Sequence, residues 1–290
     1  MVSCVNKVFR HYCVADHVFC VTAKADDFSL MANYEPFIAP SSSDSVFALA
    51  VEEGAAVDYT EEIRQDDEGQ EIICGKDNDD RSVFEFRWGG VTAGWLVCSP
   101  GYTEGRLVMT GRSRKLAIDN ALMVLYALAT ADKGTALFHA AVVSHQGLGY
   151  MFLGKSGTGK STHARLWLKY IEGTELMNDD NPVVRVGADG KAVVYGSPWS
   201  GKTPCYRNVS CPLGGIVLLS QAPYNRIRRL NGIEAYASLV PSISGKRWDT
   251  QIANGLHETE NALARMVPVW YLMCLPDEEA ARVCQSAVSR

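Results

Sequence analysis

The segment 154–161 is a complete glycine-rich phosphate-binding loop, and it constrains the fold more than any other part of the chain. It reads Gly154, Lys155, Ser156, Gly157, Thr158, Gly159, Lys160 and Ser161, which matches the pattern G-x-x-x-x-G-K-[ST]. In this pattern the glycines let backbone N–H groups turn toward phosphate oxygens. The lysine reaches the β- and γ-phosphates, and the serine hydroxyl can ligate Mg²⁺. The segment therefore predicts that the chain binds a nucleotide through its phosphates.

The segments on either side of the loop fit the same prediction. The apolar run 148–153 predicts a buried strand, and the near-helical spacing of Ala164, Trp167 and Tyr170 predicts a helix over 162–170. A strand, a glycine loop and a helix N-terminus in this order form the arrangement that holds a phosphate, with Thr162 next to Ser161 in the first turn. An ordinary glycine-rich turn is the alternative, and the flanking pattern weighs against it.

Composition excludes several classes of function. The 290 residues are long enough for one large domain or two modest ones, and the hydrophobic content of 47% supports a buried core. The net charge of −5 and the pI near 5.7 argue against a nucleic-acid-binding surface, and the basic run 226–229 is interpreted as a solvated face. The chain contains no apolar run of about 18 residues that would predict a membrane span. Residues 1–16 do not have the pattern of a secretory signal peptide.

The cysteines indicate a reducing compartment. There are nine of them, an odd number, and no C-x-x-C pair occurs, so neither a zinc site nor a disulfide framework is predicted. Most lie in apolar stretches and are interpreted as small buried hydrophobic residues. We therefore expect a cytoplasmic location.

The chain is predicted to be an α/β protein with a β-rich N-terminal region, residues 1–112, and a nucleotide-binding domain, residues 113–290. Segments rich in β-branched and aromatic residues predict strands at 18–22, 46–51, 83–88, 94–98 and 106–109. The acidic run 66–80 lacks the ligand spacing of an EF-hand loop and is interpreted as a solvated hairpin. Residues 115–130 are good helix formers, apolar on most sides, and predict a buried helix. Further strands are predicted at 136–144, 182–186, 192–195, 215–219 and 267–274, and further helices at 231–239, 258–266 and 277–286.

Asp179 and Asp180 are the candidate acids for phosphoryl transfer. Such a reaction needs carboxylates for Mg²⁺ and a group that positions or deprotonates the acceptor. The pair follows the short apolar segment 176–177, and carboxylates at the end of a strand face the crevice where open α/β sheets hold ligands. Neighbouring acids on a strand point in different directions, so one can take the metal and the other the acceptor hydroxyl. A simple turn before Pro182 is the alternative.

Two further segments are candidates for the same site. His139 lies in the strand predicted just before the loop strand, where it is either a hydrogen-bonded core histidine or an orienting group. The stretch 195–208 is rich in glycine and proline and contains Lys202 and Arg207. This composition predicts a mobile active-site loop whose cations clamp the transferring phosphate, with a plain surface connection as the alternative.

The order of these motifs resembles that of the HPr kinase/phosphorylase family. In that family a strand with a His–small-residue pair precedes the glycine loop, and a hydrophobic segment with an Asp-Asp pair follows it. Here those pieces are His139 and Ala140, the loop 154–161, and the segment 176–180. The resemblance covers about residues 135–275. It implies the P-loop nucleotide-binding core that HPr kinase shares with phosphoenolpyruvate carboxykinase.

The resemblance implies a Mg²⁺- and ATP-dependent kinase and assigns roles residue by residue. Lys160 and the loop amides hold the β-phosphate, while Ser161 and Asp180 hold Mg²⁺. Asp179 acts as the base on the acceptor hydroxyl, and His139 supports it. The implied acceptor is a serine of a protein or peptide, because relatives of this kind include kinases that phosphorylate a peptide serine.

The chain departs from the family in its N-terminal region, which does not look like the regulatory domain of the bacterial HPr kinase, and in lacking a recognisable downstream signature segment. It therefore resembles a relative rather than HPr kinase itself. One alternative is a carboxykinase-like enzyme, for which His163 is a candidate metal ligand. Another is a nucleotide-binding sensor or scaffold without catalysis. The donor nucleotide and a homo-oligomeric state are left open by the sequence.

Overall fold

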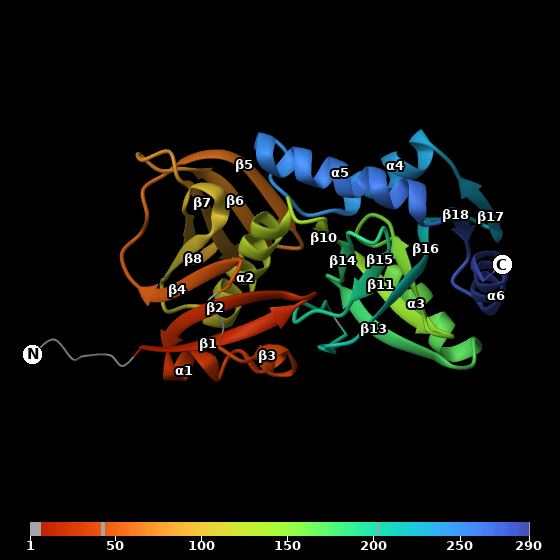
Figure 1. Ribbon diagram of the computed structural model, residues 1–290, viewed down its shortest axis with the longest axis horizontal. Coiled ribbons are helices and arrows are strands. Elements are labelled where there is room, and N and C mark those ends of the chain that lie inside the picture. Colours follow the sequence, from red (N-terminus) through yellow and green to blue (C-terminus); the bar gives the residue numbers. More distant parts are fainter. Residues whose placement is uncertain (1–6, 42–43, 202, 290) are drawn as a thin grey trace, which may run out of the picture. The chain divides into compact units, whose positions relative to one another are not determined.

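The computed structural model describes residues 7–41, 44–201 and 203–289, and the chain divides into two compact units, Met1–Thr130 and Ala131–Arg290 (Figure 1). Each unit is built on a large sheet, so the chain is a mixed α/β protein. The boundary lies after residue 130 and not between 112 and 113, where the sequence changes character. The reason is helix α2 (Arg114–Thr130), which packs against strands of the first unit.

Within the described residues, the first unit contains a nine-stranded sheet in the order β3-β1-β2-β4-β9-β8-β7-β6-β5. Its strands are β1 (Lys7–Val14), β2 (His17–Lys24), β3 (Ile38–Ala39), β4 (Phe47–Glu53), β5 (Thr60–Asp67), β6 (Gln70–Lys76), β7 (Ser82–Trp88), β8 (Val91–Cys98) and β9 (Glu104–Met109). Short helical segments are α1 (Ala25–Phe28), η1 (Ala32–Phe37) and η2 (Pro100–Tyr102). The strands predicted for this region are confirmed, and the acidic run 66–80 spans the β5–β6 hairpin and the turn into β7.

Helix α2 is buried on most of its surface because it lies against this sheet. Leu122 and Leu125 are fully buried, and the helix contacts β8 and β9. The Tyr126 hydroxyl donates a hydrogen bond of 3.0 Å to the backbone oxygen of Val14 in β1. The helix therefore belongs to the core of the first unit, which accounts for a sequence that is apolar on most sides.

The second unit contains a second mixed sheet in the order β10-β14-β15-β16-β12-β11-β13. Strand β18 pairs with the C-terminal part of β16 on the side opposite β12, and β17 pairs with β18. Its strands are β10 (Thr135–Leu137), β11 (Ala140–His145), β12 (Leu148–Leu153), β13 (Thr174–Asp180), β14 (Val183–Val186), β15 (Ala192–Tyr195), β16 (Ser210–Gln221), β17 (Arg226–Leu230) and β18 (Val269–Cys274). Strand β16 is parallel to both β12 and β18, whereas β11 is antiparallel to both β12 and β13. The strand predicted at 148–153 is confirmed as β12.

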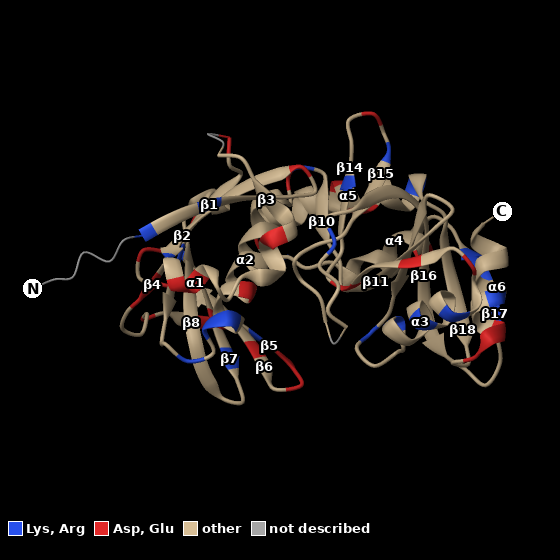
Figure 2. Cartoon of the chain, turned by 90° about the horizontal axis from the view of Figure 1, so that it is seen from below, with Lys and Arg blue, Asp and Glu red and all other residues tan. Residues whose placement is uncertain are grey.

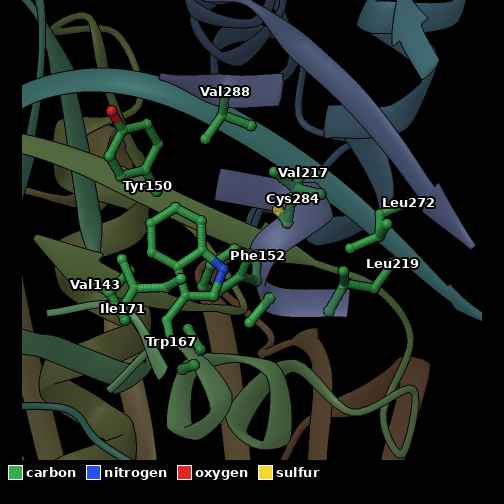
Figure 3. Packing of buried hydrophobic residues seen from close by; sticks show 13 residues of the cluster. Val143, Tyr150, Phe152, Trp167, Ile171, Val217, Leu219, Leu272, Cys284 and Val288 are labelled. Carbon is green, nitrogen blue, oxygen red and sulfur yellow. The ribbon is translucent and has the colours of Figure 1, made fainter. Parts of the chain in front are cut away.

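Helices α3 (Lys160–Tyr170) and α6 (Glu278–Val288) pack against each other and cover one face of this sheet. Their shared core is centred on Trp167, with Tyr150 and Phe152 from β12 and Val217 from β16 around it (Figure 3). The other helices are α4 (Ile233–Leu239), η3 (Val240–Ser242) and α5 (Thr250–Met266), of which α5 contacts β10 and β14. This core holds the N-terminus of α3 at the end of β12.

The single strand predicted over 136–144 is wrong, because the chain leaves one strand and enters another near His139. Phe138 forms an isolated bridge with Ile243, and the backbone N–H of His139 donates to the carbonyl of Ser242 at 2.7 Å. The backbone of Phe138 and His139 is therefore paired with the segment that follows α4 and does not continue a single strand. The break places His139 immediately before β11.

Charged residues mark two exposed strands in Figure 2, acidic ones on β5 and basic ones on β17. Arg226, Arg228 and Arg229 are exposed. Arg228 pairs with Glu234 at 2.9 Å, and the Arg229 guanidinium lies 5.8 Å from the ring centre of Trp270. The run 226–229 is thus an exposed face, as interpreted from the sequence, and two of its cations have partners within the unit.

Candidate functional site

The glycine-rich loop connects the end of β12 to the first residue of α3. Gly154 and Gly159 have φ values of 151° and 103°, and a Cβ atom on Gly154 would lie 2.4 Å from Thr158 Oγ1. The Thr158 hydroxyl donates to the Lys155 carbonyl at 2.7 Å, which closes the turn. Glycine is needed at position 154 for close approach and at 159 for a left-handed backbone.

Lys160 lies inside the loop. Its side chain is mostly buried, and Nζ donates to the carbonyls of Gly154 at 2.9 Å and Lys155 at 3.4 Å. Residues 155–157 are exposed, Ser161 is half-buried and Thr162 is exposed. The loop is therefore open to a ligand on its outer side, with its cation held within the turn.

The acid pair lies at the same edge of the sheet as the loop. Strand β11 runs antiparallel to both β12 and β13, so β12 and β13 run in the same direction. Ala141 of β11 pairs with Phe152 on one side and with Asp179 on the other, so Asp179 is level with the residue two positions before Gly154. Two inter-strand spacings separate β12 from β13, which amounts to roughly 10 Å. The sequence predicts that the acid pair lies at a strand end, facing the crevice where such sheets hold ligands.

The two acids point to opposite faces of the sheet, because successive residues alternate along a strand. Asp179 shares the face of Ala141, which packs in the core beneath α3. The side chain of Asp179 is buried, and its Oδ1 has no hydrogen-bond partner within the described residues. Buried carboxylate oxygens are normally satisfied, so this atom is one that a bound ligand or metal could engage.

Asp180 is more exposed than Asp179 and is held by two neighbours. His139 Nδ1 lies 3.0 Å from Asp180 Oδ1, and the Asn181 side-chain amide donates to Oδ2 at 2.8 Å. His139 is therefore at the site, but its partner is Asp180 and not Asp179, contrary to the role expected from the resemblance. The alternation of β13 turns Asp179 away from His139.

The residues after β15 are fastened over the end of β13. The fully buried Asn178 donates from Nδ2 to Ser197 Oγ at 3.1 Å and to the Trp199 carbonyl at 3.0 Å. The Gly201 N–H donates to the Asp179 carbonyl at 2.8 Å. Asn178 and Ser197 were not among the residues predicted for the site, although the run of asparagines and aspartates at 178–181 is the signal that could have indicated them.

The predicted cation clamp is not supported by the position of Arg207. Its guanidinium donates to Glu175 Oε2 at 2.7 Å and to the Leu176 carbonyl at 2.6 Å. Glu175 lies near the opposite end of β13 from Asp180, roughly 15 Å along the strand. Arg207 is therefore far from the phosphate loop. Lys202, the other predicted cation, lies outside the described residues.

A second segment that the sequence did not indicate borders His139. It begins at Ser242, which accepts the His139 N–H, and continues through Lys246 and Arg247. Lys246 is buried, and Arg247 forms an ion pair of 2.5 Å with the fully buried Glu260 of α5. This pair fixes the segment against α5. No periodic pattern marks it in the sequence.

His163 cannot serve as the metal ligand that a carboxykinase-like site would need. It is buried in the core, and its Nε2 accepts a hydrogen bond of 3.2 Å from the Trp167 indole. Burial lowers the pKa of His163 to about 4, so the ring is neutral at physiological pH. Its role is structural, because both its ring and its proton are enclosed by the core.

The oxygen ligands at this edge suit Mg²⁺ that arrives with a nucleotide. Within the described part of the chain, no three His, Cys, Asp or Glu side chains gather into a metal cage. Mg²⁺ in nucleotide sites is usually held by one or two carboxylates together with phosphates and water. The Ser161 hydroxyl and the Asp180 carboxylate, both partly exposed, fit that requirement.

The chain is similar to a solved structure but matches no family model and no curated protein. Among solved structures, the Hpr(Ser) kinase/phosphatase from Coxiella burnetii is similar, with 10% sequence identity and a TM-score of 0.31, over 53% of this chain and 93% of that one. This likeness indicates at most a distant relationship. Among the described helices, none is long and apolar enough to cross a membrane.

Proposed function

We propose that the second unit is a Mg²⁺- and ATP-dependent phosphotransferase whose acceptor is a hydroxyl group. The observation that carries the proposal is the shared sheet edge. The glycine-rich loop follows β12 and the acid pair ends β13, with a single strand between them. Phosphoryl transfer requires a phosphate cradle and carboxylates close to it. Here the strand that ends in the loop and the strand that ends in the acid pair are about 10 Å apart.

In this proposal the loop residues bind the donor. The exposed amides at 155–157 cradle the phosphates, and Lys160 Nζ leaves the loop carbonyls for the β- and γ-phosphate oxygens. Ser161 and Asp180 are the Mg²⁺ ligands. The close contact with His139 and the hydrogen bond from Asn181 orient the Asp180 carboxylate, as groups around a metal ligand commonly do. When bound, Mg²⁺ neutralises charge on the transferring phosphoryl group.

Asp179 is the proposed base. It accepts the proton of the acceptor hydroxyl as the hydroxyl oxygen bonds to the γ-phosphorus and the bond to the β–γ bridging oxygen breaks, which releases ADP. Its unpartnered Oδ1 is available for that proton. Because residues 197–201 cover the end of β13, the acceptor must displace or thread beside that segment to reach Asp179.

A protein or peptide serine is the proposed acceptor. This choice rests on the sequence in which the motifs follow one another and on the resemblance of that sequence to HPr kinase-like proteins. The test is incubation of the full chain with [γ-³²P]ATP, Mg²⁺ and serine-containing peptides, with Lys160→Ala as the control. Radioactive phosphoserine that requires Lys160 supports the proposal. Tight ATP binding with neither hydrolysis nor transfer to any hydroxyl would overturn it in favour of a nucleotide-binding scaffold.

A further inference from the structure

The position of the acids determines which way a bound nucleotide must lie, and this inference rests on the proposed function. Asp179 and Asp180 lie on the β11–β13 side of the loop strand β12. The γ-phosphate has to face them, because transfer occurs there. The nucleoside end of the same molecule is then directed to the other side of β12, over β16 and β18.

On that side the chain supplies a turn that touches the phosphate loop. Strands β16 and β18 run parallel to β12, so their carboxyl ends open on the same edge of the sheet. Gln221, the last residue of β16, donates from Nε2 to the carbonyl of Gly157 at 3.1 Å. The residues that follow, 222–225, cross the end of β18 on their way to β17 (Figure 1).

This turn is held firmly at both ends. The Ala222 N–H donates to the Cys274 carbonyl at 3.1 Å. The Asn225 amide donates to Asp277 Oδ1 at 3.0 Å and to Glu279 Oε2 at 2.9 Å, and its oxygen accepts from the Leu275 N–H at 2.9 Å. These bonds join the turn to the segment between β18 and α6 and to the first turn of α6.

Tyr224 is the aromatic residue that this turn presents to solvent. Its side chain is 51% exposed, although its hydroxyl contacts Met273 Sδ at 3.7 Å. The ring is therefore anchored at its polar end while much of its surface remains free. The turn that carries Tyr224 crosses the end of β18, which is two inter-strand spacings from β12. That separation is roughly 10 Å, which is comparable with the distance between base and β-phosphate in an extended nucleotide.

We propose that Tyr224 is the stacking platform for the nucleotide base. Gln221 aligns the turn with the phosphate loop, and the Asn225 bonds keep the ring in place before the ligand arrives. Stacking depends on the π-face that every base has, so the platform favours nucleotides over bare phosphates and discriminates little between adenine and guanine.

The test compares ATP, GTP and inorganic tripolyphosphate by calorimetry, on wild type, Tyr224→Ala and Tyr224→Phe. Loss of the ring should weaken ATP and GTP alike by about tenfold and leave tripolyphosphate affinity unchanged. Tyr224→Phe keeps the ring and should stay close to wild type. Because Tyr224 is exposed, its replacement is not expected to unfold the unit.

Each result has one meaning. If wild type binds ATP and Tyr224→Ala binds it equally well, the stacking platform is refuted while the proposed function stands. If Tyr224→Ala weakens tripolyphosphate as much as ATP, the residue supports the loop and not the base, which also refutes the platform. If wild type binds neither ATP nor tripolyphosphate, the proposed function fails, and this inference fails with it.

Discussion

Acidification should destabilise the second unit through His163. This residue is 2% exposed, its Nε2 accepts from the Trp167 indole, and its Nδ1 has no partner within the described residues. The native core therefore has no place for a second proton on the ring. In the unfolded chain the same histidine titrates near its ordinary pKa of about 6.5.

The sign and size of the effect follow from the two pKa values. Because the folded pKa is lowered to about 4, the unfolded state binds more protons than the native state between about pH 6.5 and about pH 4. The free energy of unfolding is thus fully retained above about pH 6.5 and falls as the pH falls. The total loss is about 3 kcal/mol, of which about 2 kcal/mol is reached near pH 5.

Urea unfolding of wild type and His163→Gln at about pH 8 and about pH 5 measures this effect. Glutamine can still accept the Trp167 hydrogen bond and does not titrate. Carboxylates elsewhere affect both proteins equally, so the wild type should lose about 2 kcal/mol more than the variant on acidification. Parallel pH dependences for the two proteins would refute the argument from burial.

Two further variants test the loop and the cover over β13. Gly154→Ala would place a Cβ atom 2.4 Å from Thr158 Oγ1 and should weaken ATP binding in calorimetry more than Gly157→Ala. Gly157 also has a positive φ, of 77°, so both variants strain the backbone, but only Gly154→Ala adds a clash; equal losses would contradict the geometry. Asn178→Ala removes the buried amide bonded to Ser197 and Trp199 and should lower the free energy of unfolding by about 2 kcal/mol. It should also speed hydrogen exchange at the Gly201 N–H, and unchanged exchange there would show that other contacts hold residues 197–201.

Elements with a strong local pattern could be predicted from the sequence. Strand β12 is a continuous apolar run between a turn and a glycine, and its predicted limits match the structure. Helix α5 was predicted to begin at residue 258 but begins at Thr250, after the capping side chain of Asp249. Gly255 obscured that start because glycine is a poor helix former. It is needed there because a Cβ atom would lie 2.4 Å from the Ala131 carbonyl.

Features that depend on distant contacts could not be predicted. The break at His139 arises because the backbone around Ser242 and Ile243 takes its hydrogen bonds. The apolar segment before the acid pair predicts its place at a strand end. The sequence does not show which acid meets His139, because only the alternation along β13 separates Asp180 from Asp179. The composition of the stretch 195–208 predicts Arg207 at the phosphates. Arg207 instead meets Glu175 near the other end of β13, and the sequence carries no information about which end of that strand it contacts.

The most direct test of the account is single-turnover transfer of the γ-phosphate by Asp179→Asn, with ATP affinity measured on the same samples. Asparagine keeps the size of the side chain and removes the base. We predict that ATP affinity stays within a few-fold of wild type while the transfer rate falls by a factor on the order of 10²–10⁴. Transfer at close to the wild-type rate would contradict the assignment of Asp179 as the base of the reaction.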